Sequence, residues 1–213
     1  MDDEEPDQRQ SSPRLQRWRK YIEITELGAI ARRYFVMNAF DGALTMLGVV
    51  IGAAMSHATD PSVIIIAGVA GSFAMGVSGY SGAYMAESAE RVKEIKTLEK
   101  AMCKPMEDDS MHKEAAKFAT QATAIVDALS PALAALIVIS PYFMVNFGML
   151  DMGTAFIMSL ALTLSILALL GMYLAKVTEE NMVMHGVKML MVGMGTAILC
   201  TLVSIGLGGE VVV

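Results

Sequence analysis

Residues 35–55 read FVMNAFDGALTMLGVVIGAAM, an apolar run that contains one charged side chain, Asp41. A helix that crosses the hydrocarbon core of a bilayer needs about 20 mostly apolar residues. Four further runs of that length follow, at 62–86, 118–139, 154–175 and 189–209. Five buried helices of a soluble bundle would need polar outer faces at every third or fourth position, and these runs lack them. The sequence therefore predicts an all-α integral membrane protein with five transmembrane helices.

The composition agrees with a membrane protein and excludes several other classes. Hydrophobic residues make up 54% of the 213 positions and charged residues 18%, so a disordered chain is excluded. Two cysteines, Cys103 and Cys200, are too few for a disulfide scaffold. A net charge of -6 disfavours a nucleic-acid partner. Ser, Cys and His residues are too scattered for a catalytic triad, so we expect no enzymatic activity and no permanently bound cofactor.

The basic residues fix the expected orientation. Seven precede the first run, seven lie between the second and third runs, and two, Lys176 and Lys188, flank the turn between the fourth and fifth. The loops 57–61 and 140–153 contain no Lys or Arg. Basic loops stay in the cytoplasm, so the N-terminus is predicted to be cytoplasmic and the C-terminus to lie outside.

Two charged segments lie at the predicted cytoplasmic side. Residues 1–34 combine an acidic tail at 2–12 with apolar residues at helical spacing, Leu15, Trp18 and Ile22, among basic ones. This pattern predicts an amphipathic helix at the membrane interface, with a solvated basic linker as the alternative. The spans at 35–86 and 118–213 are separated by a short helical segment at 87–117, with a break at Pro105 and a short helix from Ser110.

The centre of the segment 87–117 gathers soft and acidic side chains. Thioether, thiol, imidazole and carboxylate groups together could hold a divalent transition metal. The candidate ligands are Cys103, Met106, Glu107, Asp108, Asp109 and His112. An acidic turn with Ser110 as helix N-cap explains the same residues, and the lack of a fixed ligand spacing favours that alternative.

Polar groups inside the spans indicate a cation pathway, because a carboxylate in hydrocarbon is costly unless a cavity, partner or cation compensates it. On the first span, Asn38, Asp41 and Thr45 share one helical face. The third span carries Asp127 at a similar depth. The second span runs in the opposite direction and contributes polar residues toward its cytoplasmic end, namely Tyr80, Tyr84 and Glu87. Met75 of that span could add a thioether for a soft or borderline divalent metal. Alternatively, Asp127 only forms a hydrogen bond between helices and the glycines only allow close packing.

Three stretches carry a resemblance to a known family. The first span, RRYFVMNAFDGALTMLGVVIGA at 32–53, the second, AGSFAMGVSGYSGAYMAESAE at 70–90, and the last, HGVKMLMVGMGTAILCTLVSIGLG at 185–208, resemble spans of the vacuolar iron transporter family. That family includes the plant vacuolar iron transporters and the yeast vacuolar iron and manganese carrier. The chain is similar to a short form, since its insert at 87–117 is smaller than the family's cytoplasmic metal-binding domain.

The resemblance implies a homodimeric five-span carrier that exports Fe2+ or Mn2+ from the cytoplasm in exchange for protons. Asp41 matches the family's pathway carboxylate, and Gly48 and Gly52 would lie at the dimer interface. The family's second span usually carries a Ser-Met pair and then Gly-Glu-Tyr, whereas this chain has Ser78-Gly79 and Gly82-Ala83-Tyr84. Met75, Met85 or Glu87 would have to substitute.

The expected partners are membrane lipid, a second copy of the chain, divalent metal ions and protons. We expect the cell membrane as the location, with a vacuolar or other organelle membrane as the alternative. The alternative function is a transport-inactive structural, regulatory or metal-sensing membrane protein that shares the fold.

The orientation is testable by labelling single cysteines in a background that lacks Cys103 and Cys200. Met149→Cys lies in a loop without basic residues, so an impermeant thiol reagent applied from outside should label it. Lys96→Cys lies in a basic segment and should be labelled only after the membrane is permeabilised. The reverse pattern would invert the assignment of inside and outside.

Overall fold

The structure is a computed structural model that describes residues 13–107 and 110–209. The predicted acidic tail at 2–12 lies outside the described residues. Within them, the secondary-structure elements are all helices: α1 (Pro13–Ile24), α2 (Leu27–Met55), α3 (Pro61–Met102), α4 (Met111–Asn146), α5 (Met152–Thr178) and α6 (Met182–Gly206). The helices α2 to α6 are each long and apolar enough to cross a membrane. The prediction of an all-α protein with five spans is thereby confirmed.

Side-chain caps determine where three of the spans begin. The carboxylate of Asp60 accepts a hydrogen bond from the Ser62 N–H at the start of α3, and Asn181 accepts from the Val183 N–H at the start of α6. Asp151 accepts from both the side chain and the backbone N–H of Thr154. These bonds lower the pKa of the Asp151 carboxyl, so it stays charged beside the positive N-terminal end of α5.

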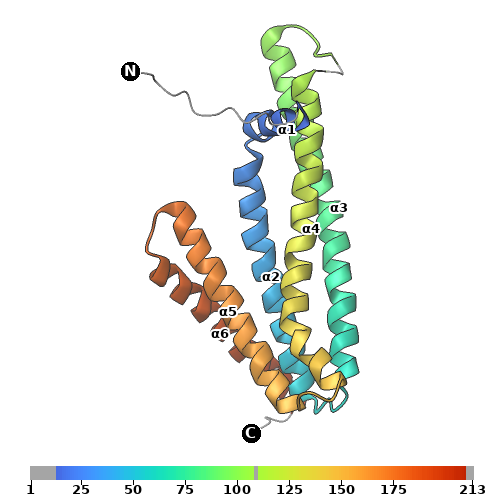
Figure 1. Cartoon of the computed structure of the whole chain (residues 1–213), viewed down its shortest axis with the longest axis vertical. Coiled ribbons are helices and arrows are strands. Elements are labelled where there is room, and N and C mark those ends of the chain that lie inside the picture. Colours follow the sequence, from blue (N-terminus) through green and yellow to red (C-terminus); the bar gives the residue numbers. More distant parts are fainter. Residues whose placement is uncertain (1–12, 108–109, 210–213) are drawn as a thin grey trace, which may run out of the picture.

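The cytoplasmic segment predicted at 87–117 consists mainly of extensions of two spans. The helix α3 continues for 42 residues and α4 for 36, and both project beyond the other helices at one end of the molecule (Figure 1). The helix predicted from Ser110 is the first part of α4, and Ser110 is its N-cap, as predicted. α3 ends at Met102 rather than at Pro105, because Cys103 adopts a left-handed backbone conformation with φ of 51°.

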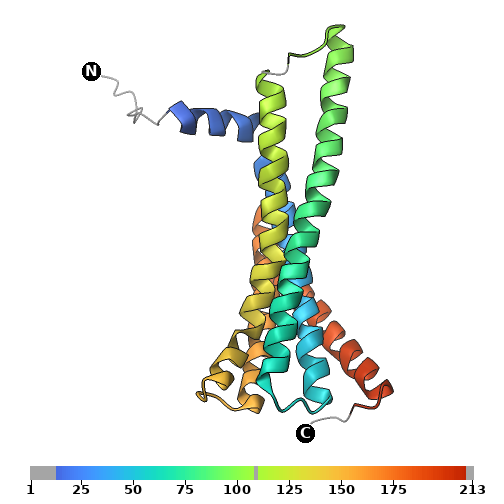
Figure 2. The same cartoon turned by 90° about the vertical axis from the view of Figure 1, so that its right-hand side faces the viewer.

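The helix predicted around Trp18 is confirmed as α1, and it lies across the long helices rather than along them (Figure 2). Trp18 is exposed, and its ring stacks on Phe118 of α4 with 6.0 Å between ring centroids. The hydroxyl of Tyr21 donates a hydrogen bond of 2.5 Å to Glu114 of α4. This crosswise placement is the one that an interfacial helix needs.

The helices α2, α3 and α4 form one bundle, and the hairpin of α5 and α6 leans away from it toward the end at which α3 and α4 project (Figure 1). The core lies mainly between α2, α4 and α5. Its fully buried members include Met46 and Val50 of α2, Val138 and Ile139 of α4, and Leu167 of α5.

Glycines set the distance between the helices of the bundle. A Cβ at Gly42 of α2 would overlap the carbonyl oxygen of Pro131 and lie 2.6 Å from its Cα. A Cβ at Gly68 of α3 would lie 2.7 Å from the Ile139 side chain. Gly48, in contrast, faces the Cys200 sulfur of α6 in the same chain, at 3.5 Å from the position of an added Cβ. Gly48 therefore faces α6 of its own chain, whereas the family resemblance implies that it lies at a dimer interface.

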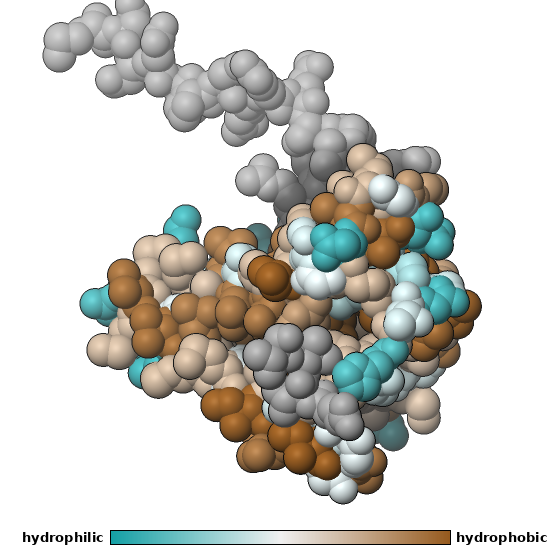
Figure 3. Space-filling model, turned by 90° about the horizontal axis from the view of Figure 1, so that it is seen from below, coloured by the Kyte–Doolittle hydropathy of each residue, from teal (hydrophilic) through white to brown (hydrophobic). Residues whose placement is uncertain are grey.

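Large apolar side chains cover much of the outside. Phe73 of α3 and Leu199 of α6 are both exposed, and apolar residues spread widely over the end seen in Figure 3. Exposed apolar surface of this extent is the expected exterior of a protein in contact with lipid.

Replacing Gly42 with Ala should destabilise the bundle, because the backbone of Pro131 cannot move away as the end of a side chain could. We expect a loss of about 1–3 kcal/mol in the free energy of unfolding, measured by thermal or denaturant unfolding in detergent. Gly195→Ala in α6 is the matched control, because no atom lies within 4 Å of its added Cβ. Equal stability of the two variants would contradict the proposed close contact.

Candidate functional site

A pocket of about 630 Å3 lies between α2, α3 and α4. Its α2 wall consists of residues spaced by three or four positions, so they share one face: Tyr34, Met37, Asn38 and Asp41. Its α3 wall is formed by small residues and one methionine: Ala74, Met75, Ser78, Gly79, Gly82, Ala83 and Ala86. Asp127 and Pro131 of α4 complete it. The structure thus brings together Asn38, Asp41, Met75 and Asp127, four of the residues singled out in the sequence.

Asp127 is buried and held in place. The Asn38 amide donates hydrogen bonds both to the Asp127 carboxylate and to the Tyr34 carbonyl oxygen one helical turn earlier. A Cβ at Gly79 would lie 2.9 Å from the Asp127 carbonyl oxygen and 3.0 Å from its carboxylate, so a glycine is needed where α3 passes α4. Asp127 therefore forms the hydrogen bond between helices that the alternative interpretation of the sequence predicts.

Asp41 has a different environment in the same pocket. Its side chain is exposed, and within the part of the chain that the structure describes its carboxylate has neither a hydrogen bond nor an ion pair. A carboxylate at membrane depth without a partner costs free energy that water, a proton or a cation must compensate. Asp41 is therefore the pocket group available to a ligand.

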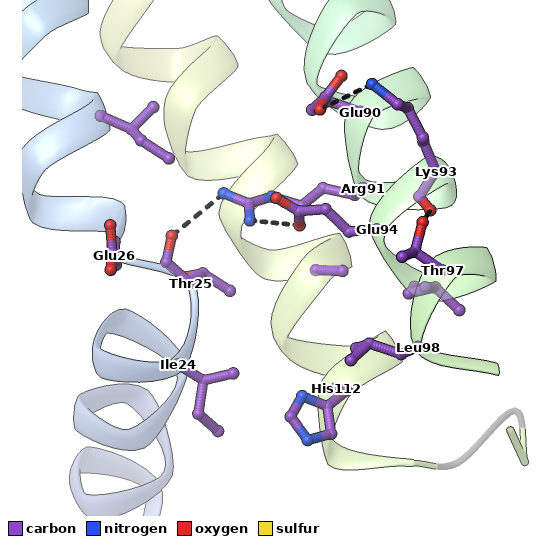
Figure 4. Close-up of a pocket in the computed structure, with 13 residues that line it drawn as sticks. Ile24, Thr25, Glu26, Glu90, Arg91, Lys93, Glu94, Thr97, Leu98 and His112 are labelled. Carbon is purple, nitrogen blue, oxygen red and sulfur yellow. Dashed lines mark hydrogen bonds and ion pairs between the residues drawn. The ribbon is translucent and has the colours of Figure 1, made fainter. Parts of the chain in front are cut away.

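Glu87 of α3 is buried, and it lies between the pocket and the cytoplasmic end of the helix. Its carboxylate accepts a hydrogen bond of 3.2 Å from the Tyr34 hydroxyl and lies 3.9 Å from the Arg91 guanidinium. Arg91 in turn donates to Glu94 at 2.8 Å and to the Thr25 carbonyl oxygen at 3.2 Å, as Figure 4 shows. Glu87 is thus part of a polar column that leads from Tyr34 through Arg91 to Thr25, just before α2, and to Glu94 in the cytoplasmic part of α3.

Three other predicted pathway residues, Thr45, Tyr80 and Tyr84, are exposed and lie outside the lining of the pocket. Tyr80 lines a separate apolar groove between α3 and α4, and its ring stacks on that of Tyr84 with 6.1 Å between centroids. At 3.6 residues per turn, these tyrosines are rotated by roughly 140° and 180° around α3 from Met75. The depth predicted for Tyr80 and Tyr84 is compatible with a position beside the pocket. The face of α3 on which they lie, however, is not the face that lines the pocket.

The sequence analysis did not identify four pocket or column residues, Tyr34, Met37, Ser78 and Arg91. The signal for Tyr34 is its spacing of four from Asn38, which places it on the same face of the helix. Arg91 follows Glu87 by four residues, which is the spacing of a helical ion pair. Met37 precedes Asp41 by the same spacing of four. Ser78 carries no comparable signal of its own and entered the sequence analysis only through the family resemblance.

The cytoplasmic cluster is not assembled into a metal site by the described residues. Cys103 and Glu107 are exposed, and His112 lines a different pocket near Arg91 (Figure 4). The N–H of Met106 donates to the Glu99 carboxylate at 3.0 Å. Asp108 and Asp109 lie outside the described residues. Within residues 13–107 and 110–209, no group of three or more His, Cys, Asp or Glu could hold a metal ion.

Five apolar helices, of which α2, α3 and α4 line a pocket with carboxylate, amide, hydroxyl and thioether groups, define a multi-pass membrane protein that offers ligands for a cation. The model of the VIT family matches residues 32–117 and 89–205. The uncharacterized protein MJ0645 of Methanocaldococcus jannaschii is 34% identical over 193 residues, which cover 89% of this chain and 97% of that protein. The chain belongs to the VIT family, a family of membrane metal ion transporters rather than enzymes. The resemblance to vacuolar iron transporters is thereby confirmed.

The hydrogen bond between Asn38 and Asp127 can be tested by a double-mutant cycle. Asn38→Ala and Asp127→Ala should each destabilise the protein in detergent, because each leaves the other polar group buried without its partner. The two effects should be non-additive by about 0.5–3 kcal/mol, measured by thermal unfolding. Asn38→Ala combined with Tyr80→Phe is the control pair and should be additive; additivity in both pairs would contradict the contact.

Proposed function

We propose that the protein moves a divalent transition metal, Fe2+ and/or Mn2+, out of the cytoplasm in exchange for protons, with Asp41 as the central ligand. The observation that carries the proposal is the Asp41 carboxylate, which opens into the pocket at membrane depth without a partner among the described residues. A divalent cation bound there would offset the cost of that charge.

The donor set of the pocket supports a transition metal over a hard cation. Oxygen donors come from Asp41, Asn38 and Ser78, and thioether sulfurs come from Met37 and Met75. Thioethers bind soft and borderline metals, whereas Mg2+ and Ca2+ take oxygen ligands. A mixed oxygen and sulfur site therefore suits a borderline metal such as Fe2+ and tolerates Mn2+ through its oxygens.

Proton exchange follows from the same carboxylate. A cation and a proton compete for Asp41, because each neutralises the same oxygens. Asp127 is the second carboxylate of the pocket, and its hydrogen bond to Asn38 gives it a structural role between α2 and α4. We propose that a proton replaces the metal on Asp41 after release, and that Asp127 stabilises the arrangement of α2 and α4 in both states.

The direction of transport is inferred from the family and supported by the column of polar groups. Tyr34, Glu87, Arg91 and Glu94 lead from the pocket toward the end that the basic residues assign to the cytoplasm. We propose that the metal enters from this end, with Glu107, Asp108 and Asp109 as weak capture groups. Cys103, Met106 and His112 stay candidates for the same role.

A homodimer would cover the exposed polar face. Asp41 and Thr45 of α2 and Ser78 of α3 are exposed, and lipid tails cannot solvate such groups. We propose that a second copy of the chain packs against this face and completes the pathway at the interface. No atom lies within 4 Å of a Cβ added at Gly52, so a second copy has room to pack there.

A transport-inactive structural, regulatory or metal-sensing protein is the second candidate. Arg91 balances Glu87 and Asn38 holds Asp127, which leaves one unpartnered carboxylate, Asp41, among the described pocket residues to offset a divalent charge. Flux measurements with Fe2+, Mn2+, Co2+, Ni2+ and Zn2+ in proteoliposomes distinguish the candidates, since a sensor would bind metal without moving it.

Asp41→Asn tests the mechanism, because it keeps the shape of the side chain and removes its charge and its titration. We expect a folded protein that loses metal flux and metal-driven proton movement, with Asp127→Asn intermediate. Both are measured in proteoliposomes with a metal-sensitive and a pH-sensitive dye.

Asp151→Asn is the matched control, since Asp151 caps α5 outside the pocket, and its flux should equal that of the wild type. A folded Asp41→Asn protein that moves metal at the wild-type rate would remove Asp41 from the mechanism. Metal binding without flux in the wild type would favour the second candidate.

A further inference from the structure

A second pocket, of about 420 Å3, lies on another side of α2, between its cytoplasmic end and the hairpin of α5 and α6. Its wall is almost entirely apolar and includes Val36 and Phe40 of α2, Val177 of α5 and Met189 of α6. Its volume falls within the roughly 300–1,000 Å3 that is typical of small-molecule sites. The α5–α6 hairpin leans away from the bundle at this end of the molecule (Figure 1).

Two arginines, Arg32 and Arg33, line the same pocket and are exposed. The Arg33 guanidinium carbon lies 5.6 Å from the centroid of the Tyr34 ring. Neither arginine is ion-paired to a carboxylate in the described ranges. The pocket therefore combines an apolar interior with two uncompensated positive charges.

More positive charge lies at the same end. Lys176 precedes the lining residue Val177, and Lys188 precedes Met189. Acidic residues also occur in the turn between α5 and α6, but Glu180 is bonded to His185. The balance of charge around the pocket favours an anion.

We propose that this pocket binds an anionic phospholipid of the cytoplasmic leaflet. The phosphate would lie between Arg32 and Arg33, whose planar guanidinium groups match phosphate oxygens. One acyl chain would lie on Val36, Phe40 and Val177. Basic pockets between spans on the cytoplasmic side bind anionic headgroups through these forces.

The bound lipid would join the two parts of the fold. Near the outer end, α2 packs directly on α6 through Leu47, Ile51 and Cys200. Near the cytoplasmic end, the contact between α2 and α5 includes the edge of Phe35 against Tyr173, with 6.3 Å between ring centroids. An acyl chain in the pocket would fill the space next to this contact and fix the hairpin against α2.

The test compares lipid retention by the purified full-length protein in mixed micelles with equimolar dioleoyl phosphatidylglycerol and dioleoyl phosphatidylcholine. Native mass spectrometry counts each lipid on the protein. We expect the wild type to retain phosphatidylglycerol in preference to phosphatidylcholine. Equal retention of the two lipids would overturn the proposal, and this measurement needs no variant.

The variant Arg32→Gln/Arg33→Gln should retain phosphatidylglycerol about 30-fold less well, from the loss of two basic groups near the headgroup. The matched control is Lys93→Gln/Lys96→Gln, which removes the same charge from exposed positions of α3 and should keep wild-type retention. Undiminished retention by the arginine variant, or an equal loss in the control, would overturn the assignment of the headgroup site.

Ala29→Trp tests the acyl-chain part, because Ala29 lines the pocket and a larger side chain would fill it while both arginines remain. We expect reduced retention of phosphatidylglycerol, and unchanged retention would overturn the placement of the chain. A dimer that Arg32→Gln/Arg33→Gln dissociates, with the lipid preference unchanged, would assign the pocket to a second copy of the chain and overturn the lipid proposal.

Discussion

The close approach of α2 and α3 to α4 governs the geometry of the bundle and of the pocket inside it. Gly42 lies against the backbone of Pro131, and Gly79 lies against Asp127, so no side chain separates the helices at these levels. Asn38 and Asp127, each about one turn from the Gly42 contact, come within hydrogen-bonding reach as a result. Lipid offers no hydrophobic force between helices, so this packing and the polar bond across it hold the pocket together.

The pocket and its column distribute charge unequally, and that inequality is the basis of the proposed function. Asp127 has Asn38, and Glu87 has both Tyr34 and Arg91. Asp41 has no comparable partner among the described residues. Structural carboxylates in a membrane are paired for stability, whereas a carboxylate that must exchange a metal for a proton has to stay accessible to both. The apolar pattern of the first span is broken at that position.

The helix α2 separates two environments and contributes to both. One face carries Asp41 toward the pocket between α2, α3 and α4, and an adjacent side carries Val36 and Phe40 toward α5 and α6. Met37 lies at the edge of both pockets. A change in the position of the α5–α6 hairpin would therefore act on the helix that carries the proposed metal ligand, so a lipid in the proposed lipid pocket would act on the same helix.

The class of fold, the number of spans and the cap at Ser110 could be predicted from the sequence alone, and so could a similar level for Asp41 and Asp127, which line one pocket. These features follow from local rules, because the bilayer requires long apolar helices and a helix has a fixed rise per residue. Which helix faces meet became known from the folded arrangement of the helices. It placed Tyr80 and Tyr84 away from the pocket, paired Glu87 with Arg91, and turned Gly48 toward Cys200. Spacing along one helix gives the residues that share a face, but the neighbour opposite that face depends on contacts between distant segments, which no single helix encodes.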